Sequence, residues 1–191
     1  MKKIIQIFSN SWKELFHTGT IVVCGLMAAL AVTLSMVASI DIGPYIRIGF
    51  SGLPNRVVEC LFGPVVGSLF GGMLDVLKYI LKPSGPFFIG FTLNVMLAGV
   101  IYGTLLYRKP VTVGRIVAAE FLTKLLVNCV LNTLWISMLY GKGFFVILPL
   151  RVLKNAIMLP IDSCILYFTL TYVKRAVRYL GGIRGSKIMH R

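Results

Sequence analysis

The last long apolar stretch of the chain carries polar side chains that could bind an anion. Residues 147–166 read ILPLRVLKNAIMLPIDSCIL, in which Arg151, Lys154, Asn155 and Asp162 interrupt an otherwise apolar segment. At about 100° of rotation per residue, these four side chains share one face of a helix. Arg and Lys side chains can donate charge-assisted hydrogen bonds to carboxylates. The stretch therefore predicts either a site for an anionic ligand or a structural polar network, and the residues alone leave both open.

A second polar stripe lies in the preceding apolar segment. Glu120, Lys124, Asn128 and Asn132 recur every four residues, and Glu four residues before Lys is the favourable order for an ion pair on a helix. Ionisable side chains within a membrane helix usually face the bundle interior or a cavity, where they pair with each other or with a ligand. A purely structural network is again the alternative.

Composition indicates that both stripes belong to a membrane protein. Of the 191 residues, 57% are hydrophobic and 14% are charged, and the mean hydropathy is +0.86. Apolar runs near 20 residues are typical of membrane-spanning helices. We therefore expect an all-α integral membrane protein of the plasma membrane with six transmembrane helices, the second of them short. The predicted helices cover residues 18–39, 54–62, 65–81, 87–107, 111–139 and 147–173.

The six helices are expected to form a single membrane domain over residues 1–191. Residues 1–17 are predicted to be a cytoplasmic, interfacial lead-in, 18–175 the six-helix bundle, and 176–191 a basic cytoplasmic tail. Between the first two helices, residues 40–53 contain Gly and Pro and are expected to form a surface loop.

The distribution of basic residues predicts that both termini face the cytoplasm. In that orientation twelve of the twenty Lys and Arg residues lie inside, as the positive-inside rule prefers. Most of the remaining eight lie near the opposite surface, where they can snorkel to the interface or form a positive vestibule for an anionic solute. These eight are Arg47, Arg56, Lys78, Lys82, Lys124, Lys142, Arg151 and Lys154.

The first predicted helix carries a face of small side chains. Its members are Cys24, Gly25, Ala28, Ala31 and Ser35. Small residues let two helices approach closely. The face can therefore pack inside the bundle or receive a partner subunit.

The sequence gives little support to metal, cofactor or nucleic-acid chemistry. His17 and His190 are far apart, and the four cysteines occur singly without a C-x-x-C pair, so we expect no metal site and no cofactor. The net charge is +14, but nucleic-acid-binding proteins keep Lys and Arg on a wetted face. Because many basic residues here lie at the ends of predicted helices, we expect no nucleic-acid partner.

Enzymatic chemistry and ATP binding are not predicted either. No histidine lies within a predicted helix to serve as a base for a nucleophile. The chain also lacks the G-x-x-x-x-G-K-[ST] sequence that cradles nucleotide phosphates.

Four segments resemble the folate-type substrate-binding (S) component of energy-coupling factor (ECF) transporters. They are IRIGFSGLPNRVVECLFGPVVGSLFGG (46–72), PFFIGFTLNVMLAGVIYG (86–103), LNTLW (131–135) and LPLRVLKN (148–155). The resemblance implies a six-helix protein that captures a vitamin from outside the cell. It also implies partners, namely a shared transmembrane coupling (T) subunit and two ATPase subunits. In that family a small-residue face on the first helix contacts the coupling subunit, and the face defined above is a candidate for this role.

If the vitamin is folate, its two ends require different side chains. A pterin ring suits a carboxylate or amide such as Asp75 or Asn94 between aromatic walls such as Phe88 and Phe91. The glutamate tail carries two carboxylates, for which Arg151 and Lys154 are the favoured cations. The full set of predicted ligand-binding residues is Arg47, Arg56, Asp75, Lys78, Phe88, Phe91, Asn94, Arg151, Lys154 and Asn155.

Two alternatives remain open at this point. The first is an S component for another vitamin, such as thiamine, riboflavin or a deazapurine, because Ile89 and Leu74 depart from the residues common in the folate family. The second is a self-sufficient small-solute carrier, although no inverted repeat is visible in the sequence.

Overall fold

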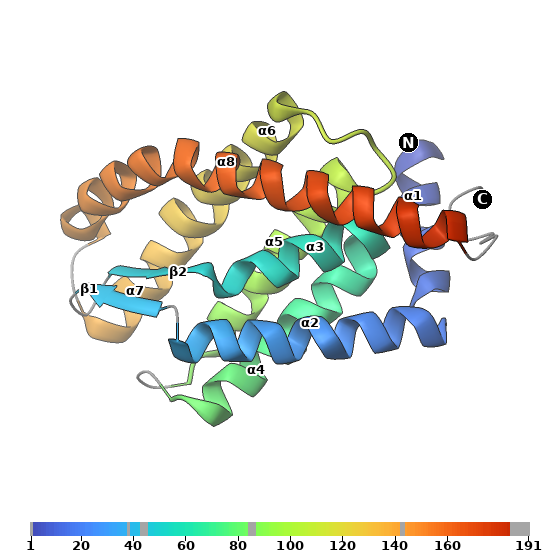
Figure 1. Ribbon diagram of the computed structural model, residues 1–191. Coiled ribbons are helices and arrows are strands. Elements are labelled where there is room, and N and C mark those ends of the chain that lie inside the picture. Colours follow the sequence, from blue (N-terminus) through green and yellow to red (C-terminus); the bar gives the residue numbers. More distant parts are fainter. Residues whose placement is uncertain (1, 38, 43–45, 84–86, 142–143, 184–191) are drawn as a thin grey trace.

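The chain is almost entirely helical in the ranges that the structure, a computed structural model, describes (Figure 1). These ranges are residues 2–37, 39–42, 46–83, 87–141 and 144–183. The helices are α1 (Lys2–Glu14), α2 (Thr18–Val37), α3 (Leu53–Phe62), α4 (Pro64–Leu81), α5 (Ile89–Leu106), α6 (Val113–Thr123), α7 (Asn132–Tyr140) and α8 (Phe144–Ile183). The other elements are strands β1 (Ser39–Ile42) and β2 (Ile46–Gly49), the 3₁₀ turn η1 (Phe50–Gly52) and the π-helical segment η2 (Lys124–Leu131).

Five of the described helical segments are long and apolar enough to cross a membrane. They are α2, α4, α5, the continuous helix formed by α6, η2 and α7, and most of α8. Helix α3 has only 10 residues, about half the length that a bilayer requires. The prediction of an all-α, multi-pass membrane protein is therefore confirmed. The number of crossings and the side on which the termini lie stay predictions.

Helices α3 and α4 are separated by a single residue, Gly63. Its φ of 91° lies in a region that glycine adopts without strain. Pro64 follows as the first residue of α4, where a missing backbone N–H costs nothing. The Gly-Pro pair thus ends a short helix and begins a long one within one peptide unit.

Helices α4 and α5 pack with almost no side chain between them. A Cβ added to Gly103 would lie 2.4 Å from Cα of Pro64, and one added to Gly99 would lie 2.8 Å from the backbone nitrogen of Ser68. Both distances are shorter than any side chain tolerates. The two helix backbones are therefore in direct contact, and only glycine fits at these points.

Two apolar clusters form the core around these helices. One includes Tyr102, Leu106, Ile116 and Leu166, so it joins α5, α6 and α8. The other includes Ala31, Val58 and Phe70, so it joins α2, α3 and α4. Short helix α3 contributes to both clusters, which explains how ten residues stay fixed between longer helices.

The segment predicted to be a surface loop contains a β-hairpin instead. Strands β1 and β2 pair antiparallel, with Asp41 opposite Arg47. The physical reason lies in the alternation IDI and IRI, which places β-branched residues at every second position. The hairpin lies at the end of the molecule opposite to α1 and the end of α8 (Figure 1).

Helix α8 is longer than a bilayer is thick. Its 40 residues correspond to roughly 60 Å at 1.5 Å per residue, against a hydrocarbon core of about 30 Å. Pro149 and Pro160 lie inside the helix, and each removes one backbone hydrogen bond. Because α8 continues to Ile183, the start of the predicted tail is part of this helix, while residues 184–191 lie outside the described ranges.

Candidate functional site

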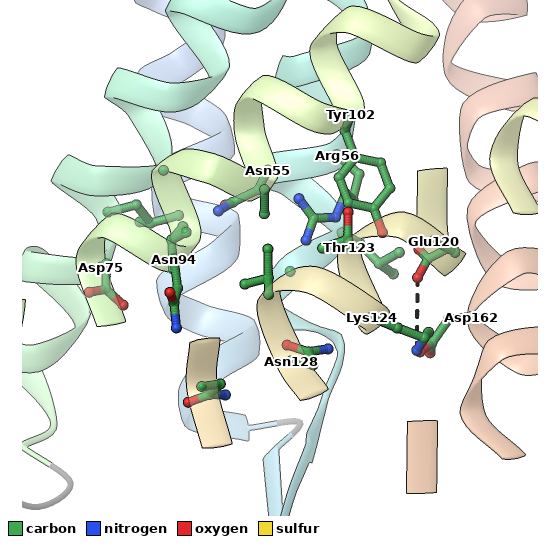
Figure 2. A pocket seen from close by; sticks show the side chains of 18 of the residues that line it. Asn55, Arg56, Asp75, Asn94, Tyr102, Glu120, Thr123, Lys124, Asn128 and Asp162 are labelled. Carbon is green, nitrogen blue, oxygen red and sulfur yellow. Dashed lines mark hydrogen bonds and ion pairs between the residues drawn. The ribbon is translucent and has the colours of Figure 1, made fainter. Parts of the chain in front are cut away.

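A cavity of about 380 Å³ lies inside the bundle (Figure 2). Side chains from α3, α4, α5, α6, η2, α7 and α8 line it, and η1 reaches it through Gly52. This volume lies within the range of about 300 to 1,000 Å³ that is usual for small-molecule sites. The two polar stripes of the sequence meet here, because Glu120, Lys124, Asn128 and Asn132 line the same cavity as Asp162.

One wall of the cavity is formed by a fixed arginine. Nη1 of Arg56 lies 2.8 Å from both carboxylate oxygens of Glu59, three residues later on α3. The guanidinium carbon lies 3.7 Å from the centre of the Tyr102 ring on α5. Glu59 is fully buried, and a charged pair of this kind holds its geometry because separating it would leave a buried charge without compensation. Arg56 is thus presented to the cavity in one orientation.

A lysine is held by two acids where η2 faces α8. Nζ of Lys124 lies 2.5 Å from Oδ2 of Asp162 and 3.8 Å from Oε2 of Glu120 (Figure 2). Lys124 and Glu120 are both buried. The pair from Lys124 to Asp162 joins residues 38 positions apart in the sequence, so it connects two membrane helices across the site.

Three buried polar atoms on the cavity wall have no hydrogen-bond partner among the described residues. They are Oδ1 of Asn55, Nδ2 of Asn94 and Oγ1 of Thr123. Oδ1 of Asn94 accepts a hydrogen bond from Nε1 of Trp135 at 3.1 Å, which orients the amide and leaves its Nδ2 as a donor. Buried polar atoms normally find partners. These three therefore suit a ligand that brings a donor and acceptors of its own.

Helix α4 contributes one acid and one base to the same cavity. Asp75 accepts a hydrogen bond from Oγ1 of Thr92 at 2.8 Å, and Nζ of Lys78 donates to the backbone oxygen of Ser51 at 3.0 Å. Ser51 belongs to η1, directly after the hairpin. Lys78 thus ties the rim of the cavity to α4.

The structure brings about half of the predicted ligand-binding residues to this cavity. Those that line it are Arg56, Asp75, Lys78, Phe91 and Asn94. Phe88 is not on the described wall but packs against Phe91 and Trp135, with ring centres 5.8 and 5.3 Å apart. The side chain of Arg47 lies outside the described part of the structure, although its backbone belongs to β2.

The favoured predicted cations are not on the described wall of the cavity. Arg151, Lys154 and Asn155 are absent from its lining in the part of the chain that the structure describes. Nη1 of Arg151 donates to the backbone oxygen of Asn128 at 3.4 Å, and Asn155 contacts Asn128 and Cys129. Two of the three are thus in contact with η2, which itself forms part of the wall.

Several cavity residues were not predicted. Asn55, Thr123 and Tyr102 line the site but were not assigned to it from the sequence. For Asn55 a signal existed, because it lies next to Arg56 in the short helix, within the polar run PNR. Thr123 and Tyr102 lie in apolar surroundings in the sequence, so only the packing of the helices places them at the site.

The small-residue face of α2 is largely used within the chain. Ala31 is fully buried and Ser35 is 9% exposed, and Cys24 and Ala28 pack against the same apolar cluster as Ala31. Ala31 and Ser35 therefore pack within the chain, which was one of the two alternatives for this face, and docking of a partner on it stays a prediction. Gly25 is exposed, and a Cβ added there would have no atom within 4 Å.

A bundle of apolar helices around a polar cavity defines a multi-pass membrane protein that binds a small molecule. Residues 19–170 match the family model of the substrate-specific component of ECF transporters. The chain belongs to this family. It is therefore a component of a transporter in the plasma membrane and not an enzyme, and members of this family work with a coupling subunit and ATPases.

Individual relatives are similar over most of their length. The folate transporter FolT of Clostridium novyi is 40% identical over 124 residues, which are 65% of this chain and 72% of that protein. The folate transporter FolT of Leuconostoc mesenteroides is 30% identical over 153 residues, which are 76% of this chain and 83% of that protein. A crystal structure of FolT bound with folic acid matches with a TM-score of 0.75 and 31% identity, over 82% of this chain and 95% of that chain.

Proposed function

We propose that this chain binds folate in the cavity described above and delivers it to an ECF transporter complex. The observation that carries the proposal is the wall itself, on which partnerless amide and hydroxyl atoms lie near three cations. Folate matches this chemistry because it combines a ring rich in donors and acceptors with a dianionic tail. The similarity to two folate transporters and to a structure containing folic acid supports the choice of ligand.

The pterin ring is proposed to bind where the amides converge. Nδ2 of Asn94 can donate to a ring acceptor, while Oδ1 of Asn55 and the carboxylate of Asp75 can accept from ring N–H groups. Phe91 lines the same cavity and offers a flat apolar surface. A ring that is hydrogen-bonded along its edge and covered on its face would be fixed in both position and orientation.

The glutamate tail is proposed to pair with cations of the cavity wall. The candidates there are Arg56, Lys78 and Lys124. Arg56 and Lys124 each already hold a carboxylate of the protein, so a ligand carboxylate would join these pairs or replace one of them. Direct contacts from Arg47, Phe88, Arg151, Lys154 and Asn155 stay predictions.

Transport is proposed to depend on a coupling subunit and two ATPases. The chain lacks the G-x-x-x-x-G-K-[ST] sequence that binds nucleotide phosphates, so the energy for transport is proposed to come from ATP hydrolysis by other subunits. The exposed side of α2 around Gly25 is the proposed docking site, because its neighbours Ile21, Val22 and Leu26 are exposed as well. Small and apolar residues on one side of a membrane helix favour close contact with another helix.

Calorimetric titration of the purified chain tests the ligand. Folate is titrated beside pteroate, which lacks the glutamate, and beside riboflavin and thiamine. We expect the tightest binding for folate and weaker binding for pteroate, because the tail pairs are lost. Tighter binding of riboflavin or thiamine than of folate would contradict the proposal and support one of the alternative vitamins.

A further inference from the structure

The wall formed by η2 has an unusual backbone. In this segment the backbone hydrogen bonds span five residues instead of four, as in the bond from the N–H of Asn132 to the oxygen of Val127. Such π-helical segments are rare and occur often at functional sites. Here the segment carries Lys124, Val127 and Asn128 to the cavity, so its register decides which side chains the ligand meets.

One backbone carbonyl beside this five-residue bond is held by side chains. The five-residue bond ends on Val127, and α7 begins at Asn132. The carbonyl held by side chains is that of Asn128, the residue after Val127. It accepts hydrogen bonds from Oγ1 of Thr133 and from Nη1 of Arg151, both at 3.4 Å.

A neighbouring residue on α8 holds the same part of η2. Oδ1 of Asn155, four residues after Arg151, accepts a hydrogen bond from Nδ2 of Asn128 at 3.4 Å. Nδ2 of Asn155 donates to the sulfur of Cys129 at 3.5 Å. The backbone and the side chain of Asn128 are thus both held from α8, and Arg151 is only 8% exposed.

We propose that Arg151 and Asn155 are positioning residues that clamp η2 in its π-helical register and so turn the side chain of Asn128 toward the ligand. This inference rests on the proposed function, since it assigns the residues a part in folate binding. Backbone polar groups at membrane depth need hydrogen-bond partners, and the guanidinium of Arg151 supplies one to the Asn128 oxygen from α8, beside the hydroxyl of Thr133 from α7. Without the clamp, the segment gains by returning to α-helical spacing, which rotates Asn128 relative to the cavity.

A double-mutant cycle on folate affinity tests the clamp. Arg151→Met is measured alone and together with Asn128→Ala, and the control cycle combines it with Lys78→Met on α4. We expect Arg151→Met alone to weaken folate binding about tenfold. In a chain that already carries Asn128→Ala, Arg151→Met should weaken folate binding by no more than about a further threefold, because the effects of coupled residues are not additive. In a chain that already carries Lys78→Met, Arg151→Met should still weaken folate binding by the full factor of about ten, because the effects of independent sites are additive.

The outcomes separate the role of Arg151 from the identity of the ligand. A full tenfold loss in both backgrounds would overturn the clamp and support direct contact of Arg151 with folate. A wild-type chain that binds no folate would contradict the proposed function instead. Arg151→Lys keeps a donor, so it should recover part of the affinity under the clamp.

A second variant decides the question if Arg151→Met does not fold. Asn155→Ala is neutral and removes the partner of the Asn128 side chain. It should weaken folate binding in the wild-type background and have no further effect beside Asn128→Ala. An undiminished effect of Asn155→Ala beside Asn128→Ala would overturn the clamp.

Discussion

Oγ of Ser11 donates a hydrogen bond to the backbone oxygen of Phe62 at 2.7 Å, which joins amphipathic helix α1 to the break between α3 and α4. Oγ of Ser11 also accepts hydrogen bonds from the backbone N–H groups of Val65 and Val66 at 3.0 and 3.3 Å. One hydroxyl therefore supplies hydrogen-bond partners to a backbone carbonyl at the end of α3 and to two backbone N–H groups at the start of α4. Ser11 is fully buried, although it belongs to the helix that precedes the membrane region.

Ser11→Ala is expected to destabilise the chain by about 1 to 3 kcal/mol, because it leaves buried backbone groups of the α3–α4 junction without partners. The measurement is thermal melting of the purified chain in lipid nanodiscs. Ser9→Ala is the matched control, since Ser9 lies on the same helix and is exposed. Equal melting temperatures for the two variants would show that α1 does not support the junction.

Glu59→Ala is expected to cost about 3 to 5 kcal/mol of stability and to weaken folate binding, because it leaves the half-buried guanidinium of Arg56 without its acid. Its control is Glu14→Ala, which removes an exposed pair with Arg108 at 3.4 Å and should cost at most about 1 kcal/mol. Thermal melting and folate titration are measured for both. A Glu59→Ala chain with unchanged folate affinity would remove Arg56 from the proposed ligand contacts.

Lys78→Met is expected to weaken folate binding about tenfold and pteroate binding much less, because a charge-assisted hydrogen bond to the tail is lost. Lys82→Met is the control, since Lys82 directly follows the end of α4, is exposed and lies outside the cavity lining. Calorimetric titration of both ligands checks the prediction. Equal losses for folate and pteroate would point to a role of Lys78 in fixing Ser51.

Gly25→Trp is expected to leave folate binding and stability unchanged but to reduce folate uptake by the assembled transporter. The reason is that its side chain would project from the exposed side of α2 into the proposed contact with the coupling subunit. Ala31→Trp should behave differently and lower the melting temperature, because Ala31 is fully buried. Uptake into proteoliposomes containing all subunits is compared with binding by the isolated chain. Normal uptake by Gly25→Trp would move the docking site elsewhere.

The helices could be predicted from the sequence because each depends on a local property. Apolar runs of the right length, ended by pairs such as Gly63-Pro64, predict α2 to α8 to within a few residues at most ends. The hairpin was not predicted, because its alternating isoleucines fill only two short segments. The Gly and Pro between these segments favoured the prediction of a loop instead. Local patterns thus predict the elements well, and the hairpin is an element that a closer test of alternation could have found.

The site could be predicted only in part, because it depends on how helices face each other. Both polar stripes were recognised from the sequence. The ion pair between Lys124 and Asp162 joins one stripe to the other, so neither stripe alone predicts it. The helical wheel also assumes a constant rotation per residue, and η2 breaks this assumption near Asn128. The polar face of α8 around Arg151 was expected to meet the ligand. In the structure Arg151 contacts the backbone of η2, and a direct contact with the ligand stays a prediction.

The backbone contact at Gly99 and Gly103 has a mechanical consequence for transport. Helices that touch through their backbones have little room to slide or tilt against each other, so we expect α4 and α5 to move together. The opposite wall, formed by η2 and α8, is held by side chains, including the pair between Lys124 and Asp162. Side-chain contacts can exchange partners while backbones stay intact. We therefore expect the cavity to open for loading or release where η2 meets α8.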